Sequence, residues 1–183
     1  MQSVHPRIAE IISELQASER ELIDTVSALT PAQRDAPPTS DQWSVAQNVE
    51  HLAVVEDGVG RLVSTLIKQI AETGARETDE SSLLRSLDKF SIDVANVRIP
   101  APERVQPRES LPVHESLARL AVARARLIDA YTRASGMALG DASAPHPFAG
   151  PLNVYQWGLM SAQHTRRHIV QIRTLVSSPT TAA

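Results

Sequence analysis

The chain has 183 residues, of which 42% are hydrophobic and 21% charged, and its formal net charge is −3. This composition is typical of one soluble globular domain with a sizeable core. It contains no cysteine, which excludes disulfides, a cysteine nucleophile and thiolate metal ligands. No basic run favours a nucleic-acid partner, and no apolar run is long enough to cross a membrane. The first residues lack the pattern of a signal peptide, so we expect a cytoplasmic protein.

Apolar residues recur every three or four positions in four separate stretches of the chain. This spacing gives a helix one apolar face, so it predicts an all-α fold, a four-helix bundle. The helices are expected near residues 7–29, 44–73, 111–135 and 151–177. Residues 178–183 are expected to form a disordered tail, which leaves residues 1–177 as a single domain.

Local signals mark the starts of two helices. Ser44 followed by Gln47 is the pattern of a capping box, which places the start of the second helix. Pro151 is expected to open the fourth helix after a loop, because proline suits the first helical turn.

Gly58 and Gly60 lie inside the second helix and lower its helix propensity, so we expect close packing or a bend there.

Residues 75–110 form a long connection between the second and third helices. The segment contains Pro100, Pro102 and Pro107, and one short helix is expected around residues 81–90. So long a connection is unusual in a compact domain, but in a bundle it can return the chain to the opposite end. We therefore expect a long crossover that makes the second and third helices parallel.

His164 and His168 lie about one turn apart on the expected fourth helix. They share a face with Trp157 and Leu175, and a soluble helix normally buries such a face. Buried imidazole nitrogens need partners, and one metal ion could serve both rings. The spacing alone is more often that of two surface histidines, and Trp157 is more often a core residue than a platform for a substrate. His51, at the edge of the apolar arc of the second helix, is by itself typical of a half-exposed residue.

Three groups of residues occur in a characteristic order. They are Trp43-Ser44-Val45-Ala46 followed by Asn48-Val49-Glu50-His51-Leu52, then Gly150-Pro151-Leu152-Asn153, and then His164-Thr165-Arg166-Arg167-His168. Together they resemble the DinB-like superfamily, which includes the bacillithiol transferases. The resemblance covers the first, second and fourth helices, whereas the third helix and residues 75–110 match only in length and pattern.

The resemblance implies a four-helix bundle that holds a divalent metal ion through three histidines. Matched residue by residue, these ligands are His51, His164 and His168. Imidazole ligands suit several metals, and we expect zinc or nickel, with iron or manganese as alternatives. The same match gives His146 no ligand role, and both His146 and His114 are expected at the surface.

Polar residues near the three histidines are candidates for orienting the imidazole rings. The candidates are Gln47 and Asn48 on the second helix and Asn153, Ser161 and Gln171 on the fourth. Helix capping is the alternative for Asn153, and packing or solvent contact is the alternative for the others. Glu50 is rotated away from His51, so we expect a surface charge rather than a general base.

A metal ion with three imidazole ligands keeps open positions for water or for a thiolate. Some members of the resembled family look like S-transferases that use bacillithiol or mycothiol, and a chain without cysteine would take its thiol from a cosubstrate. We therefore predict a metal-dependent transferase that moves an electrophile onto a small-molecule thiol, or a related hydrolase. The alternative is a non-catalytic, stress-related metal- or ligand-binding module. A homodimer is expected, because relatives often form one and Val54 and Val55 extend the apolar surface of the second helix.

Overall fold

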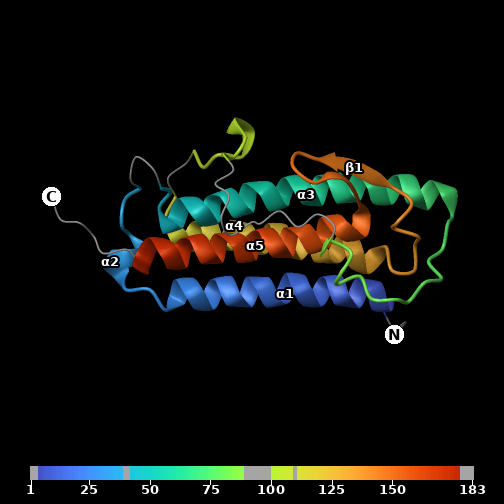
Figure 1. Cartoon of the computed structure of the whole chain (residues 1–183), viewed down its shortest axis with the longest axis horizontal. Coiled ribbons are helices and arrows are strands. Elements are labelled where there is room, and N and C mark those ends of the chain that lie inside the picture. The colour runs from blue at the N-terminus through green and yellow to red at the C-terminus, as the bar shows by residue number, and fades with distance from the viewer. Residues whose placement is uncertain (1–3, 39–41, 89–99, 109–110, 178–183) are drawn as a thin grey trace.

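Four long helices lie side by side in the structure, a computed structural model that describes residues 4–38, 42–88, 100–108 and 111–177 (Figure 1). The helices are α1 (Pro6–Ser27), α3 (Val45–Thr73), α4 (Val113–Arg133) and α5 (Val154–Ser177). The connections contain a short helix α2 (Pro31–Arg34) and a 3₁₀ helix η2 (Glu103–Val105). Strands β1 (Ser143–His146) and β2 (Gly150–Asn153) pair as an antiparallel hairpin. The predicted four-helix fold is confirmed.

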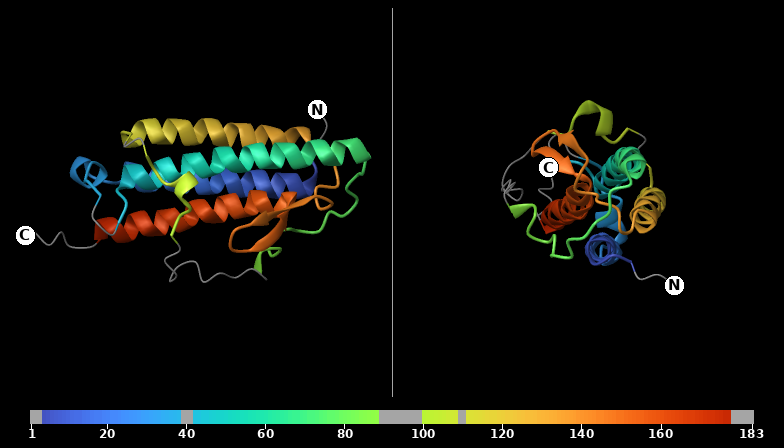
Figure 2. Two further views of the ribbon diagram at one scale, coloured as in Figure 1. Left: turned by 90° about the horizontal axis from the view of Figure 1, so that it is seen from above. Right: turned by 90° about the vertical axis from the view of Figure 1, so that its right-hand side faces the viewer.

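The long connection makes α3 and α4 parallel, as expected. Glu56 near the middle of α3 pairs with Arg124 of α4, and Arg76 just after α3 bridges Met137 just after α4. Figure 1 shows α1 and α5 running in the opposite direction. The end-on view in Figure 2 shows the four helices arranged as a bundle, with the hairpin outside it.

A buried polar layer crosses the core between two apolar clusters, and every long helix contributes to it. Its centre is the ion pair of Arg124 and Glu56, in which Arg124 Nη2 lies 2.7 Å from Glu56 Oε2. Arg124 also donates to Ser18 Oγ and to Thr165 Oγ1, each at 3.1 Å. Burying two charges is unfavourable unless their hydrogen bonds are made, and this layer makes them.

Gly158 brings three helices close together. A Cβ atom at this position would lie 2.6 Å from Ile11 Cγ2 of α1 and 2.7 Å from the Tyr131 hydroxyl of α4. Gly58 and Gly60 of α3 have no such neighbour within 4 Å of an added Cβ. The expectation of close packing at those two glycines is therefore wrong.

The residues predicted to open the fourth helix form strand β2 instead. Gly150 has a φ of 73° at the start of that strand, and the helix begins only at Val154. Asn153 caps it, since its side chain accepts the Gln156 N–H at 3.0 Å and its own N–H donates to the Gln156 side chain at 3.0 Å. The prediction that Pro151 opens the fourth helix is wrong, because proline suits an edge strand as well as a first helical turn.

Some expectations fall partly or wholly outside the described residues. Residues 84–87 are hydrogen-bonded turns, with Ser86 N–H donating to the Leu83 carbonyl and Asp88 N–H to the Arg85 carbonyl, and Asp88 has a 3₁₀ conformation, so residues 81–88 contain no α-helix. Residues 89–90 and the expected tail, residues 178–183, are not among those described. Within the described part of the chain, no helix is both long and apolar enough to cross a membrane.

Candidate metal centre

His51 of α3 meets His164 and His168 of α5 between the two antiparallel helices. The Nε2 atom of His164 lies 3.4 Å from Nε2 of His51 and 3.2 Å from Nε2 of His168. One ring nitrogen from each of the three lies within 4.8 Å of the others. Three neutral imidazoles at this spacing could hold one divalent metal ion. The structure thus brings together the three residues that the sequence singled out.

Two of the three rings are oriented by a hydrogen bond that the Nδ1 atom donates, on the side of the ring away from the centre. His51 Nδ1 donates to the Val105 carbonyl oxygen at 2.6 Å, and His168 Nδ1 donates to Asn48 Oδ1 at 2.8 Å. The Asn48 amide is itself fixed, because its Nδ2 donates to the Ser44 carbonyl at 2.9 Å. With a proton on each Nδ1, the Nε2 atoms of both rings keep a free lone pair directed at the centre.

The long connection supplies the acceptor for His51. Val105 belongs to η2, which lies over the first half of α3 (Figure 1). Next to it, the Arg108 N–H donates to the Glu50 carboxylate at 2.7 Å, which fastens the connection to α3. Glu50 is buried, so the expectation of a surface charge is wrong. A backbone carbonyl carries no signature in the sequence, so this contact could not be foreseen.

Trp43 forms one wall of the centre. Its ring stacks on His168 with centroids 6.4 Å apart and planes at 9°, and it tilts against His51 with centroids 5.0 Å apart. Both histidines are only 4% exposed, so the half-exposed alternative for His51 is wrong, while His164 keeps partial exposure. The aromatic wall keeps water from two of the rings.

Burial lowers the pKa of all three histidines, because an imidazolium loses its hydration there. The neighbouring imidazoles lower the pKa of His164 and His168 further, and the positive charge of Arg167 lowers all three. For His51 the Val105 carbonyl acts in the opposite direction. The rings are thus held neutral, which is the form that coordinates a metal.

Of the five polar candidates, Asn48 is the one seen to orient a histidine among the described residues. Gln47 belongs to the capping box of α3 and Asn153 to that of α5. Ser161 donates to Glu56 in the polar layer at 3.1 Å, and Gln171 is exposed. Gln171 was therefore wrongly expected among the residues that orient the imidazole rings.

The two remaining histidines of the prediction differ from one another. His114 is exposed, as expected. His146 is half-buried in β1, with its ring centroid 5.3 Å from that of Trp157, so the expectation of a surface loop residue is wrong. Trp157 is 7% exposed and belongs to the apolar core, which confirms its packing role.

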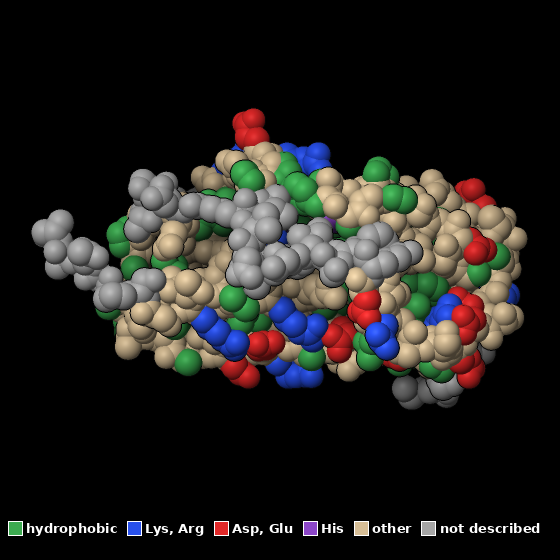
Figure 3. All heavy atoms as spheres, viewed as in Figure 1, with side chains coloured by type: hydrophobic (Ala, Val, Ile, Leu, Met, Phe, Trp, Pro, Cys, Tyr) green, Lys and Arg blue, Asp and Glu red, His purple; other side chains and the backbone are tan. Residues whose placement is uncertain are grey.

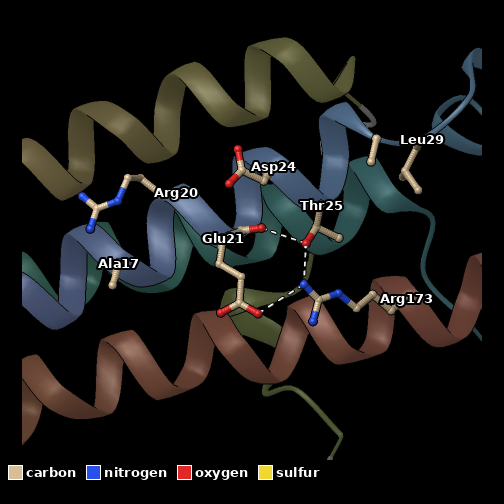
Figure 4. A pocket seen from close by; sticks show the side chains of 8 residues that line it. Ala17, Arg20, Glu21, Asp24, Thr25, Leu29 and Arg173 are labelled. Atoms are coloured by element: carbon tan, nitrogen blue, oxygen red, sulfur yellow. Dashed lines mark hydrogen bonds and ion pairs between the residues drawn. The ribbon is translucent and has the colours of Figure 1, made fainter.

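A separate groove of about 610 Å³ lies between α1 and α5, and none of the three histidines lines it (Figure 4). Arg173 spans it, bonding to Thr25 Oγ1 at 3.1 Å and to Glu21 at 3.2 Å. Figure 3 shows acidic and basic side chains side by side along this face. Because Arg173 is paired across the groove, we place the candidate site at the histidines instead.

Comparison with known proteins agrees with the motifs. A family model of the DinB superfamily, DinB_2, matches residues 14–172, a range that includes all three histidines. TT2238, described as a four-helix bundle protein, is similar in structure, with a TM-score of 0.60 and 24% identity over 93% of this chain and 99% of that chain. This similarity shows the fold alone, and no curated protein matches the chain. The family match extends over most of the sequence, and the chain belongs to the DinB superfamily.

Proposed function

We propose that the protein is a metal-dependent transferase that joins a low-molecular-weight thiol to an electrophile, with His51, His164 and His168 as the metal ligands. One observation carries the proposal. Three Nε2 atoms converge while the Nδ1 atoms of His51 and His168 donate to fixed acceptors. Histidines that merely filled the core would not need this common orientation.

The donor set suits such chemistry. Three imidazoles leave a divalent ion with open positions, and a bound ion would favour the thiolate form of a cosubstrate thiol at neutral pH. The chain orients two rings through Val105 and Asn48 and shields them with Trp43. It contains no cysteine, so the sulfur nucleophile would come from the cosubstrate. The thiol proton would leave to solvent, a sulfur–carbon bond would form, and the leaving group would depart.

We also propose the identity of the metal and of the thiol. All-imidazole ligands favour zinc or nickel over the harder divalent ions, with iron or manganese as alternatives. Bacillithiol and mycothiol are the candidate thiols, by the resemblance to S-transferases of the family. A related hydrolase would use the same open position for water.

The test is turnover by metal-loaded protein. Zinc- or nickel-loaded protein is mixed with a chromogenic aryl halide and a panel of thiols, namely bacillithiol, mycothiol, glutathione and cysteine. We expect thioether formation above the uncatalysed rate, its loss on chelation and in His164→Ala, and its retention in the exposed control His114→Ala. Tight metal binding without turnover for any thiol would reject the transferase and support the alternative, a non-catalytic metal- or ligand-binding module.

A further inference from the structure

The indole nitrogen of Trp157 has no hydrogen-bond acceptor among the described residues. The side chain is 7% exposed and its Nε1 atom is buried. A buried N–H without an acceptor destabilises a fold by about 1–3 kcal/mol, so proteins rarely keep one without a use. Trp157 lies on α5 two turns before His164, on the face that carries the histidines.

His146 presents a second donor beside this indole. Its Nδ1 accepts the N–H of Phe148 at 3.2 Å and that of Ala149 at 3.1 Å. Since Nδ1 is the acceptor, the proton of the neutral ring is on Nε2, which is therefore a donor. The turn of the hairpin thus fixes the tautomer of His146.

Two neighbouring N–H donors cannot satisfy each other. The rings of His146 and Trp157 lie with centroids 5.3 Å apart and planes at 54°. We propose that these two side chains form a binding subsite for a carboxylate oxygen of a small-molecule ligand. A carboxylate has only acceptors and can take hydrogen bonds from both donors at once.

The subsite adjoins the metal centre. Trp157 and His164 are seven positions apart on the helix, which is about 10 Å along the axis. The positive charge of Arg167 acts on all three metal-site histidines. This positive charge favours an anionic group over a neutral one. We propose that the subsite holds one end of a ligand whose other end reaches the metal. In this respect the subsite rests on the proposed function.

The hairpin lies beside the subsite, because it carries His146. The indole nitrogen is buried, so a carboxylate can reach it only if side chains around it move, and the His146 ring is one of its neighbours. Phe148, at the turn next to His146, is 50% exposed. Ligand binding should therefore perturb the hairpin as well as the indole.

The first experiment follows the indole N–H signals by nitrogen–proton correlation NMR of the metal-free full chain. The chain has two tryptophans, and Trp43→Phe assigns their signals. Propionate is titrated to about 100 mM, since two hydrogen bonds give only millimolar affinity for so small a probe. We expect a saturable downfield shift of the Trp157 signal that propanol does not produce. His146→Ala should weaken binding about fivefold, and His114→Ala should not.

An unsaturable or absent shift at Trp157, or the same shift with propanol, would overturn the subsite. Both variants and the wild type give a spectrum that shows whether the chain is folded, so a loss of binding is not confused with a loss of structure. Trp157→Phe keeps an aromatic side chain but removes the five-membered ring that carries the N–H, and it should abolish the carboxylate preference measured in the second experiment.

The second experiment separates the subsite from the proposed function. Cobalt-loaded protein is titrated with mercapto acids of three to eight carbons and with the matching mercapto alcohols. A thiolate–cobalt charge-transfer band tests thiol binding at the metal, and a tighter binding of the best acid over its alcohol tests the subsite. A band without that gain overturns the subsite beside the metal. If propionate shifts the Trp157 signal but no thiolate–cobalt charge-transfer band appears, the subsite is supported and thiol transfer is contradicted.

Discussion

The imidazoles at the centre are held by contacts that a protein would not need for packing alone. Asn48 Oδ1 accepts the Nδ1 proton of His168, and the same amide is fixed by the carbonyl of Ser44. The rigid start of α3 thus holds the Asn48 amide through the Ser44 carbonyl, and the amide in turn holds the His168 ring. Losing the amide should therefore loosen the metal ligand without removing it.

Replacing Asn48 by leucine should weaken metal affinity by about 10- to 100-fold, because His168 loses the acceptor that sets its tautomer and ring orientation. Asn48→Asp keeps an acceptor oxygen and should retain most of the affinity. The measurement is competition with a chromogenic chelator, with the exposed Gln171→Ala of α5 as control. Wild-type affinity in Asn48→Leu would show that the amide plays no part in the site.

The lowered pKa values of the three histidines set the pH dependence. Three imidazoles with the ordinary pKa of about 6.5 would lose metal affinity on the order of a thousandfold by about pH 5.5. Here the folded-state pKa values lie below that, so protons compete with the metal only at lower pH. We expect much less than that loss in chelator competition between about pH 7.5 and 5.5. A thousandfold fall would contradict the burial of the rings.

The same shifts bear on the stability of the metal-free fold. The unfolded chain binds protons at these histidines from about pH 6.5 downward, while the folded chain does not. The free energy of unfolding should therefore be highest above pH 6.5 and decrease as the pH falls toward the folded-state values. This follows from the direction of the shifts alone.

The residue types at the centre could be predicted from the sequence, but their surroundings could not. The i, i+4 spacing of His164 and His168 gave a shared helix face, and the resemblance added His51. Asn48 was one of five candidates, because neighbouring helix positions alone do not say which side chain meets a ring on another helix. The Val105 carbonyl was missed, since every residue has one.

Close packing of the helices depends on Gly158 rather than on the glycines of α3. Gly158→Ala should destabilise the fold by about 1–3 kcal/mol, because the added Cβ would overlap Ile11 and the Tyr131 hydroxyl. Gly60→Ala should instead stabilise it by up to about 1 kcal/mol, as alanine favours the helix and has room there. Denaturant unfolding measures both. Equal effects of the two substitutions would contradict the packing described here.

Periodicity predicted the long helices because their apolar faces repeat over many turns. It failed for the segment from Ser143 to Asn153, where two four-residue strands are too short to show an alternation. It also treated residues 75–110 as a mere connection, although η2 within it binds a metal-site histidine. Short elements are fixed by tertiary contacts, which a local pattern does not contain.

The expected homodimer concerns the apolar residues of α3 that were predicted to lie on its outer side. Val54 of α3 is exposed, whereas Val55 packs partly against the core of its own chain. We still predict a dimer at micromolar concentration, with sedimentation equilibrium giving about twice the chain mass of 19.9 kDa. Val54→Lys should shift it toward the monomer. A clean monomer for the wild type would refute this prediction.

The proposed function depends most on one metal ion held by the three histidines together. The measurement is metal per chain by elemental analysis after zinc loading and dialysis, for the wild type and for His51→Ala, His164→Ala, His168→Ala and His114→Ala. We predict one ion per chain for the wild type and His114→Ala. The other three variants should lose most of the metal while circular dichroism shows intact helices. Wild-type stoichiometry and affinity in His51→Ala or His168→Ala would contradict the three-histidine site and the function proposed from it.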